Sequence, residues 1–216
     1  MSKRRYELII FDWDGTISDS VALIAECMQL TAVEHQLPMP TSQQAANIIG
    51  LGLKQAIKTL FPPADEQLIE MLSQSYSKYY RQKSQGPSHF FPHVIETLKS
   101  IKDSDYLIAV ATGKSQAGLN RELNASGLEG FFDATRCADQ TASKPDPLML
   151  KQLLDQFNLG AEQAIMVGDT EYDMEMAARI EMPRLAVSYG AHAPDRLIAY
   201  QPVACIDCFS EIINYI

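Results

Sequence analysis

Short apolar runs alternate with longer helix-like stretches along most of this chain, and this alternation constrains the fold more than any other feature. Nearly continuous apolar runs are typical of strands in a parallel sheet that is covered on both faces. We therefore predict an α/β fold with a doubly wound parallel sheet. The predicted strands are 8–11, 106–111, 164–167, 184–187 and the weaker 203–206, and the predicted helices are 93–103, 115–125, 147–158, 171–180 and 193–200.

One region interrupts this alternation. Residues 17–85 contain helix-like stretches separated by proline and glycine, and no convincing strand. Candidate hinges bound the region at Gly15-Thr16 and at residues 85–87. We predict an all-helical cap domain over residues 17–85, inserted into a core domain made of residues 1–16 and 86–216.

Charge and composition narrow the function classes. The net charge of −9 disfavours sequence-independent binding of nucleic acid or of an anionic membrane surface. No apolar run approaches the roughly 20 residues that span a bilayer, so we expect a cytoplasmic protein. Four cysteines do not make a disulfide framework, and the CxxC at 205–208 lacks the second pair that a zinc site needs.

The first predicted strand ends in the sequence FDWDGT, residues 11–16. Side chains two residues apart on a strand point to the same face, so Asp12 and Asp14 leave the sheet together. Adjacent carboxylates repel unless a cation or a shared proton offsets their charge. A calcium loop is excluded because Gly15 follows the second aspartate at once. A metal-nucleotide-sugar DxD motif and a pair of capping carboxylates remain as alternatives.

Thr112 follows the second predicted strand. Residues 113–115 look like the end of a P-loop, but Ile108 stands where that motif requires glycine. The Thr112 hydroxyl and the next backbone N–H groups, beginning with Gly113, could hold a phosphoryl oxygen. The alternative is that Thr112 caps the following helix.

Two later segments add charge to the ends of strands. Lys144, in SKPDP, is placed to offset anionic charge, although most lysines are plain surface residues. Asp169 follows a buried strand, and Asp173 lies one helical turn further on. A capping box with Thr170 would explain Asp173 but does not require Asp169. Ligands of open α/β sheets bind at the carboxyl ends of strands, so these groups predict a Mg²⁺ site beside an anion site.

The ordered set of FDWDGT, Thr112, Lys144-Pro145 and residues 168–173 (GDTEYD) resembles the four motifs of the haloacid dehalogenase (HAD) superfamily of hydrolases. The match spans the chain. Residues 17–85 resemble the cap of the phosphoglycolate phosphatase/β-phosphoglucomutase-like branch. The resemblance implies a Rossmann-like core with a helical cap.

The resemblance also implies a mechanism. Asp12 would attack phosphorus and form an aspartyl-phosphate. Asp14 would protonate the leaving alcohol and then deprotonate the water that releases phosphate. Mg²⁺ would be bound by the Asp12 carboxylate, the Asp14 backbone carbonyl and Asp169. Asp173 would complete the metal site by orienting water.

Further positions follow from the same resemblance. Thr112, Gly113 and Lys144 would bind the phosphoryl group, and Lys144 would also restrain Asp12. Residues 50–54 (GLGLK) resemble the cap loop of phosphoglycolate phosphatases. We hypothesise that Lys54 reaches an anionic leaving group and sets specificity, and the alternative is an exposed Lys54 at the start of a helix. Trp13 departs from the family pattern and is expected to crowd the other face of the strand or the entrance.

The sequence thus predicts a Mg²⁺-dependent phosphatase, a monomer or homodimer, that acts on a small-molecule phosphate ester. Phosphoglycolate is the leading substrate by resemblance. A phosphomutase of the β-phosphoglucomutase type is the alternative enzyme. A non-catalytic phosphate- or metal-binding module is the alternative of another class, and it would have no use for Asp14 as acid and base.

Overall fold

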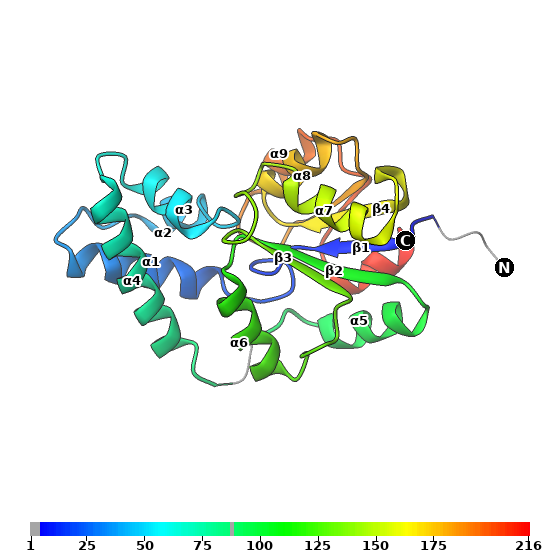
Figure 1. Ribbon diagram of the computed structural model, residues 1–216, viewed down its shortest axis with the longest axis horizontal. Helices are drawn as coiled ribbons and strands as arrows, with labels where there is room; N and C mark the ends of the chain where they lie inside the picture. The colour runs from blue at the N-terminus through cyan, green and yellow to red at the C-terminus, as the bar shows by residue number, and fades with distance from the viewer. Residues whose placement is uncertain (1–4, 87–88) are drawn as a thin grey trace.

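The computed structural model describes residues 5–86 and 89–216, and its centre is one parallel sheet (Figure 1). The strand order is β3-β2-β1-β4-β5-β6, with β1 in the middle. Every pair of neighbouring strands is parallel, which confirms the predicted doubly wound α/β fold. The strands are β1 (Leu8–Phe11), β2 (Leu107–Thr112), β3 (Ala134–Cys137), β4 (Ala164–Gly168), β5 (Arg184–Val187) and β6 (Cys205–Ile206).

Helices cover both faces of this sheet, as the side chains of β1 require. Ile9 and Phe11 join one hydrophobic cluster, whereas Leu8 and Ile10 join the other, because successive strand residues face opposite ways. The first face is covered by α5 (Val94–Asp103), α6 (Gln116–Ser126) and η2 (Phe209–Asn214). The second is covered by α7 (Leu148–Phe157) and α8 (Glu171–Ala178), while η1 (Ala161–Gln163) directly precedes β4 and α9 (Pro194–Ile198) lies between β5 and β6.

Strand β3 is absent from the prediction. It lies at the edge of the sheet, so only its first and last residues are buried. Arg136, in its middle, donates hydrogen bonds to Gln152 and Gln156 rather than entering the core. A half-exposed edge strand with a polar centre lacks the continuous apolar run by which the other strands are recognised.

Four helices lie between β1 and α5 and have a hydrophobic core of their own, which includes Met28, Ile57 and Leu72. In Figure 1 they gather beside the end of the sheet toward which the β1 arrow points. This agrees with the expected helical insertion. The domain limits at 17–85 stay a prediction, and residues 1–4 and 87–88 lie outside the described residues. The helices are α1 (Val21–Glu34), α2 (Ser42–Ala46), α3 (Leu53–Leu60) and α4 (Glu66–Lys83).

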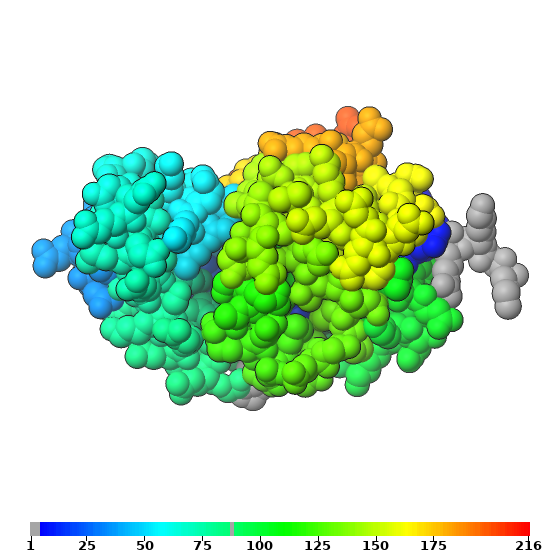
Figure 2. All heavy atoms as spheres, in the orientation of Figure 1, coloured from blue at the N-terminus to red at the C-terminus, as the bar shows by residue number. Residues whose placement is uncertain are grey.

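The loop before α3 lies directly on the core. The backbone N–H of Gly52 donates a hydrogen bond to Ser143 Oγ at 2.8 Å, and the Tyr172 hydroxyl donates one to the Asn47 carbonyl at 2.8 Å. A Cβ atom on Gly113 would lie 2.5 Å from the carbonyl oxygen of Leu51. In Figure 2 the blue-to-teal atoms of the helical segment accordingly abut the green atoms of the core. The helical segment therefore covers the end of β2.

Candidate active site

The carboxyl edge of the sheet brings together five of the residues that the sequence singled out. Asp12 follows β1, Thr112 ends β2 and Asp169 follows β4. Because β1 lies between β2 and β4, these three strand ends are neighbours. The loop before α7 adds Lys144, and α8 adds Asp173. All five side chains are buried.

Three carboxylates converge at this edge. One carboxylate oxygen from each of Asp12, Asp169 and Asp173 lies within 4.8 Å of the other two. Gly15 makes the approach possible: its φ is +82°, and a Cβ atom there would lie 2.1 Å from Asp169 Oδ2. The Thr16 hydroxyl donates a hydrogen bond to Asp169 Oδ1 at 2.8 Å. The glycine and threonine of FDWDGT therefore shape the site as much as its aspartates do.

Lys144 supplies a buried positive charge to this cluster. Its Nζ lies 2.7 Å from Asp12 Oδ1 and 2.6 Å from Asp173 Oδ1, to which it donates a hydrogen bond. Burial alone would lower the pKa of Lys144, but the charges of Asp12 and Asp173 outweigh burial and raise that pKa above its ordinary value. The lysine therefore stays protonated, and it compensates only part of the charge of three carboxylates.

The Asp12 carboxylate is the unsatisfied group of the cluster. Its Oδ1 lies 2.7 Å from Lys144 Nζ, whereas its buried Oδ2 has no hydrogen-bond donor within the described residues. Burial raises the pKa of Asp12 well above its ordinary value; Lys144 opposes this rise, and Asp173 and Asp169 add to it. Buried carboxylates without donors are costly unless a cation approaches them. Asp12 thus has the properties of a metal ligand.

The other two carboxylates, Asp169 and Asp173, accept hydrogen bonds from neighbouring groups. Asp169 accepts one hydrogen bond on each oxygen, from Thr16 and from the Ala191 backbone at 2.7 Å, and a carboxylate has lone pairs for more. Asp173 is held by Lys144 and by the Thr170 hydroxyl, which donates to Oδ2 at 2.6 Å. The expected capping box between Thr170 and Asp173 is present. Hard oxygen donors of this kind are the ligands that Mg²⁺ prefers, so the three carboxylates could hold this ion.

Asp14 lies beside this cluster in a different network. Its Oδ1 accepts a hydrogen bond from the Ser20 hydroxyl at 2.6 Å and lies 3.0 Å from Lys114 Nζ. Lys114 also pairs with Glu122 at 2.8 Å, and the Tyr80 hydroxyl of α4 donates to Glu122 at 2.8 Å. Burial raises the pKa of Asp14, although Lys114 opposes the rise. A carboxyl group with a raised pKa is suited to holding a proton.

Sequence reasoning missed Lys114, Glu122 and Tyr80. The available signal was the position of Lys114, two residues after the end of β2, in a segment that does not complete a P-loop. Nothing in the sequence pairs Glu122 with a residue of the helical insertion.

Trp13 contacts the same glutamate: its buried indole N–H donates to Glu122, and its ring lies edge-on to Phe90. The indole joins the hydrophobic core instead of crowding the entrance.

Lys54 lies away from the other predicted residues. Its side chain is 72% exposed, and its Nζ is 2.9 Å from Glu70 Oε2 on α4. The neighbouring Leu53 lines the active-site cavity, but Lys54 does not. A role of Lys54 in specificity stays a prediction, and this position does not favour it.

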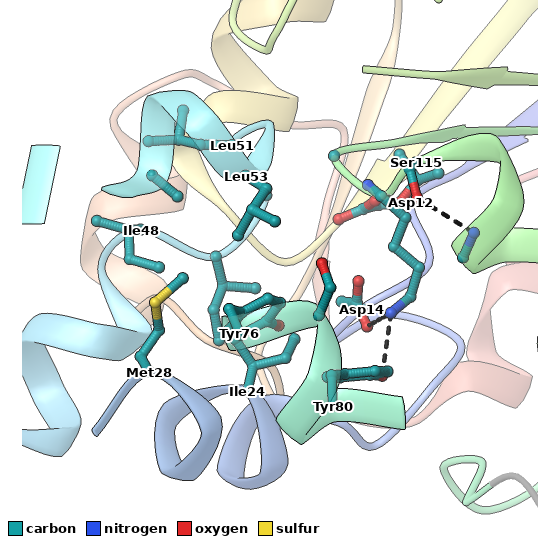
Figure 3. Close-up of a pocket in the computed structure, with 18 of the residues that line it drawn as sticks. Asp12, Asp14, Ile24, Met28, Ile48, Leu51, Leu53, Tyr76, Tyr80 and Ser115 are labelled. Atoms are coloured by element: carbon teal, nitrogen blue, oxygen red, sulfur yellow. Dashed lines mark hydrogen bonds and ion pairs between the residues drawn. The ribbon is translucent and has the colours of Figure 1, made fainter. Parts of the chain in front are cut away.

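A cavity of about 120 Å³ lies between the carboxyl edge and the helical insertion. Its core side contains Asp12, Asp14, Thr112 and Gly113, so the structure brings these predicted residues to one cavity. Figure 3 shows Asp12 and Asp14 on one side and residues of the helical insertion facing them. Lys114, which also lines the cavity, contacts Asp14 from the core side and donates a hydrogen bond to the Tyr80 hydroxyl at 3.0 Å.

Comparison with known proteins identifies the family. Residues 9–187 match the family model described as haloacid dehalogenase-like hydrolase. The chain belongs to this family. The expectation that the protein is an enzyme of the HAD-like hydrolases is therefore confirmed. The order of the motifs along the chain and their meeting at one sheet edge are consistent with that membership.

Individual relatives extend over nearly the whole chain. A protein of Dickeya dadantii (strain 3937), named "Probable phosphatase IndB", is 34% identical over 96% of this chain and 92% of its own length. A phosphoglycolate phosphatase of Aliivibrio fischeri is 29% identical over 96% of this chain and 95% of its own. A HAD-like family hydrolase from Streptococcus pneumoniae has a TM-score of 0.82 at 26% identity, covering 98% of both chains. The HAD-like chain therefore shares its overall fold with solved members.

The carboxylate cluster predicts an unusual pH dependence of stability for the metal-free protein. Burial, with the Asp173 charge, raises the pKa of Asp169 to about 7 from an ordinary value of 3.8. The folded state therefore holds more protons than the unfolded state between these values, so the free energy of unfolding falls as pH rises. We expect a loss of about 3 kcal/mol from pH 4 to pH 7 relative to Asp169→Asn. Urea denaturation of both proteins in EDTA measures it, and parallel pH curves would contradict the prediction.

Proposed function

We propose that this HAD-like hydrolase is a Mg²⁺-dependent phosphatase that cleaves small phosphate monoesters through an aspartyl-phosphate on Asp12. One observation carries the proposal: the buried Asp12 carboxylate is held by Lys144 through Oδ1, its Oδ2 has no donor within the described residues, and it lines the same cavity as Asp14. A nucleophile must be free to attack, and a leaving alcohol needs an acid within reach. The relative named phosphoglycolate phosphatase makes phosphoglycolate the first candidate substrate.

In the first half-reaction an Asp12 oxygen forms a bond to phosphorus while the bond between phosphorus and the ester oxygen breaks. Asp14 gives its proton to the departing alkoxide, and its raised pKa favours the protonated form that this step needs. In the second half-reaction Asp14 takes a proton from water. The water oxygen attacks phosphorus, phosphate leaves and the Asp12 carboxylate is restored.

The remaining residues supply charge and position. Lys144 neutralises the phosphoryl oxygens and keeps Asp12 in place through the 2.7 Å contact. Thr112 and the backbone N–H of Gly113 bind the phosphoryl group at the end of β2. Bound Mg²⁺, held by the Asp12 and Asp169 carboxylates and the Asp14 carbonyl, would neutralise further charge on the phosphoryl group. Positioning and charge stabilisation are what phosphoryl transfer mainly requires.

Metal removal tests the proposal. Phosphate release from phosphoglycolate, sugar phosphates, nucleotides and alkyl phosphates is measured with Mg²⁺ and after EDTA treatment. We expect release that EDTA abolishes and that added Mg²⁺ restores, because Lys144 alone offsets only part of the negative charge that Asp12, Asp169 and the phosphoryl group bring together. Release that continues unchanged in EDTA would overturn the metal requirement.

The same assay separates the alternatives. A phosphomutase would release little phosphate and would need a bisphosphate activator, and a binding module would release none. No observation on the described residues favours either alternative. None of the helices within residues 5–86 and 89–216 is both long enough and apolar enough to cross a membrane. Cytoplasmic location and a monomeric or homodimeric state stay predictions.

A further inference from the structure

The cavity above Asp12 has two chemically different sides. Across from the carboxylates, the helical insertion contributes a largely apolar wall (Figure 3). Three of its side chains are fully or almost fully buried, so this wall offers little contact with water. The residues that form it include Ile24 and Met28 of α1, Ile48, Leu51, Leu53 of α3 and Tyr76 of α4.

This wall faces the place that a leaving group must occupy. Asp12 and Asp14 line the same cavity, so an ester whose phosphorus meets Asp12 extends its alcohol portion toward the helical insertion. A charged group placed against Leu51 and Leu53 would lose hydration without gaining a partner, which is costly. An apolar group in the same place would be stabilised by leaving water.

The nearby cations do not make the cavity favourable for a charged leaving group. Lys114 is the cation closest to Asp14, and it is already paired with both Asp14 and Glu122. Lys54 is paired with Glu70 outside the cavity. Arg121 of α6 makes no ion pair within the described residues, but it is exposed, so water and salt screen its charge.

We propose that the cavity selects phosphate monoesters whose leaving alcohol is uncharged and mainly apolar, such as an aromatic or branched aliphatic alcohol. The inference rests on the proposed phosphatase function and runs against phosphoglycolate, whose leaving alcohol carries a carboxylate. Tyr76 adds one neutral phenol group to this wall. One uncharged polar substituent on the alcohol therefore fits the cavity as well.

A matched set of esters tests the proposal. Benzyl phosphate, 3-methylbutyl phosphate and phosphoglycolate are all esters of primary alcohols, so they differ mainly in what the cavity must accommodate. With the full chain and Mg²⁺ we expect kcat/KM for the two apolar esters to exceed that for phosphoglycolate by about tenfold or more. A preference for phosphoglycolate that depends on Asp12 would leave the phosphatase standing and overturn the apolar specificity.

A pair of leucine variants in α3 locates the effect. Leu53 and Leu60 are both partly buried against the same helical cluster, but only Leu53 lines this cavity. We expect Leu53→Ala to lower kcat/KM for 3-methylbutyl phosphate about tenfold through KM, with phosphoglycolate little affected. Leu60→Ala should leave the ratio between the two esters unchanged. Equal effects of the two variants on that ratio would count against the proposal.

Binding of inert analogues keeps the inference testable when no turnover is seen. Phosphonates replace the bridging ester oxygen by carbon, so 2-phenylethylphosphonate stands for benzyl phosphate and 3-phosphonopropionate for phosphoglycolate. Calorimetric titration of the wild-type protein with Mg²⁺ should show tighter binding of the phenyl compound by about tenfold. Tighter binding of the carboxylate compound would overturn the proposal independently of the reaction.

Discussion

Replacing Asp12 by asparagine is expected to abolish phosphate release while the protein stays folded. The amide has nearly the same shape as the carboxylate, but it is a poor nucleophile and a weaker metal ligand. We expect kcat to fall by about 10⁴-fold or more, as for the loss of other catalytic nucleophiles. Stability of the metal-free protein should not fall, because the change removes one of three buried carboxylates that lie within 4.8 Å of one another.

The measurement is phosphate release under single-turnover conditions, with thermal unfolding in EDTA as the test of folding. Asp103→Asn is the matched control, since Asp103 is exposed at the end of α5. Its activity should equal that of the wild type. A folded Asp12→Asn protein that keeps more than a tenth of the wild-type rate would show that Asp12 is not the nucleophile.

Replacing Lys144 by methionine is expected to damage both activity and stability. The buried Lys144 ammonium group lies within 2.7 Å of both Asp12 and Asp173, and methionine leaves those carboxylates without it. Removing one partner of a buried ion pair costs about 3–5 kcal/mol. Loss of a charge that stabilises the phosphoryl group should lower kcat by about 10²–10³-fold. Because deprotonated carboxylates repel more strongly, the deficit in stability should grow as pH rises.

Urea denaturation of the metal-free proteins at pH 5 and pH 8 measures this effect. Lys151→Met on the exposed surface of α7 is the control and should match the wild type. Added Mg²⁺ should recover part of the lost stability, since a cation can take over some of the compensation. A deficit that is the same at both pH values would mean that Lys144 acts through packing and not through its charge.

The carboxylate cluster could be predicted from the sequence because it follows from the direction in which the parallel strands run. Each of Asp12, Thr112 and Asp169 ends or follows an apolar strand, and parallel strands bring their carboxyl ends to one edge. The short FDWDGT segment also contains the glycine that lets Asp169 approach and the threonine that hydrogen-bonds it. Such features are local in sequence or follow from strand order, so they can be predicted without coordinates.

The pairing of charges around Asp14 could not be predicted in the same way. Lys114, Glu122 and Tyr80 meet because the hydroxyl of Tyr80, on α4 of the insertion, reaches Glu122 on α6 of the core, and the sequence does not specify that contact between distant segments. For Lys54 the sequence predicted a contact with substrate that the structure does not show. Its loop resembles a substrate loop, yet the side chain extends from α3 to Glu70. One helical position decides that Leu53, and not Lys54, lines the cavity.

The sequence by itself determined the α/β core, the helical insertion and the residues at the strand ends, because periodicity and chain direction encode them. Only the tertiary structure decided which charges compensate one another and what lines the cavity opposite Asp12. Those contacts join residues far apart in the chain, and they depend on how the helical insertion lies on the sheet edge. The carboxylate cluster is therefore predictable from motifs, whereas the lining of the cavity opposite it depends on packing.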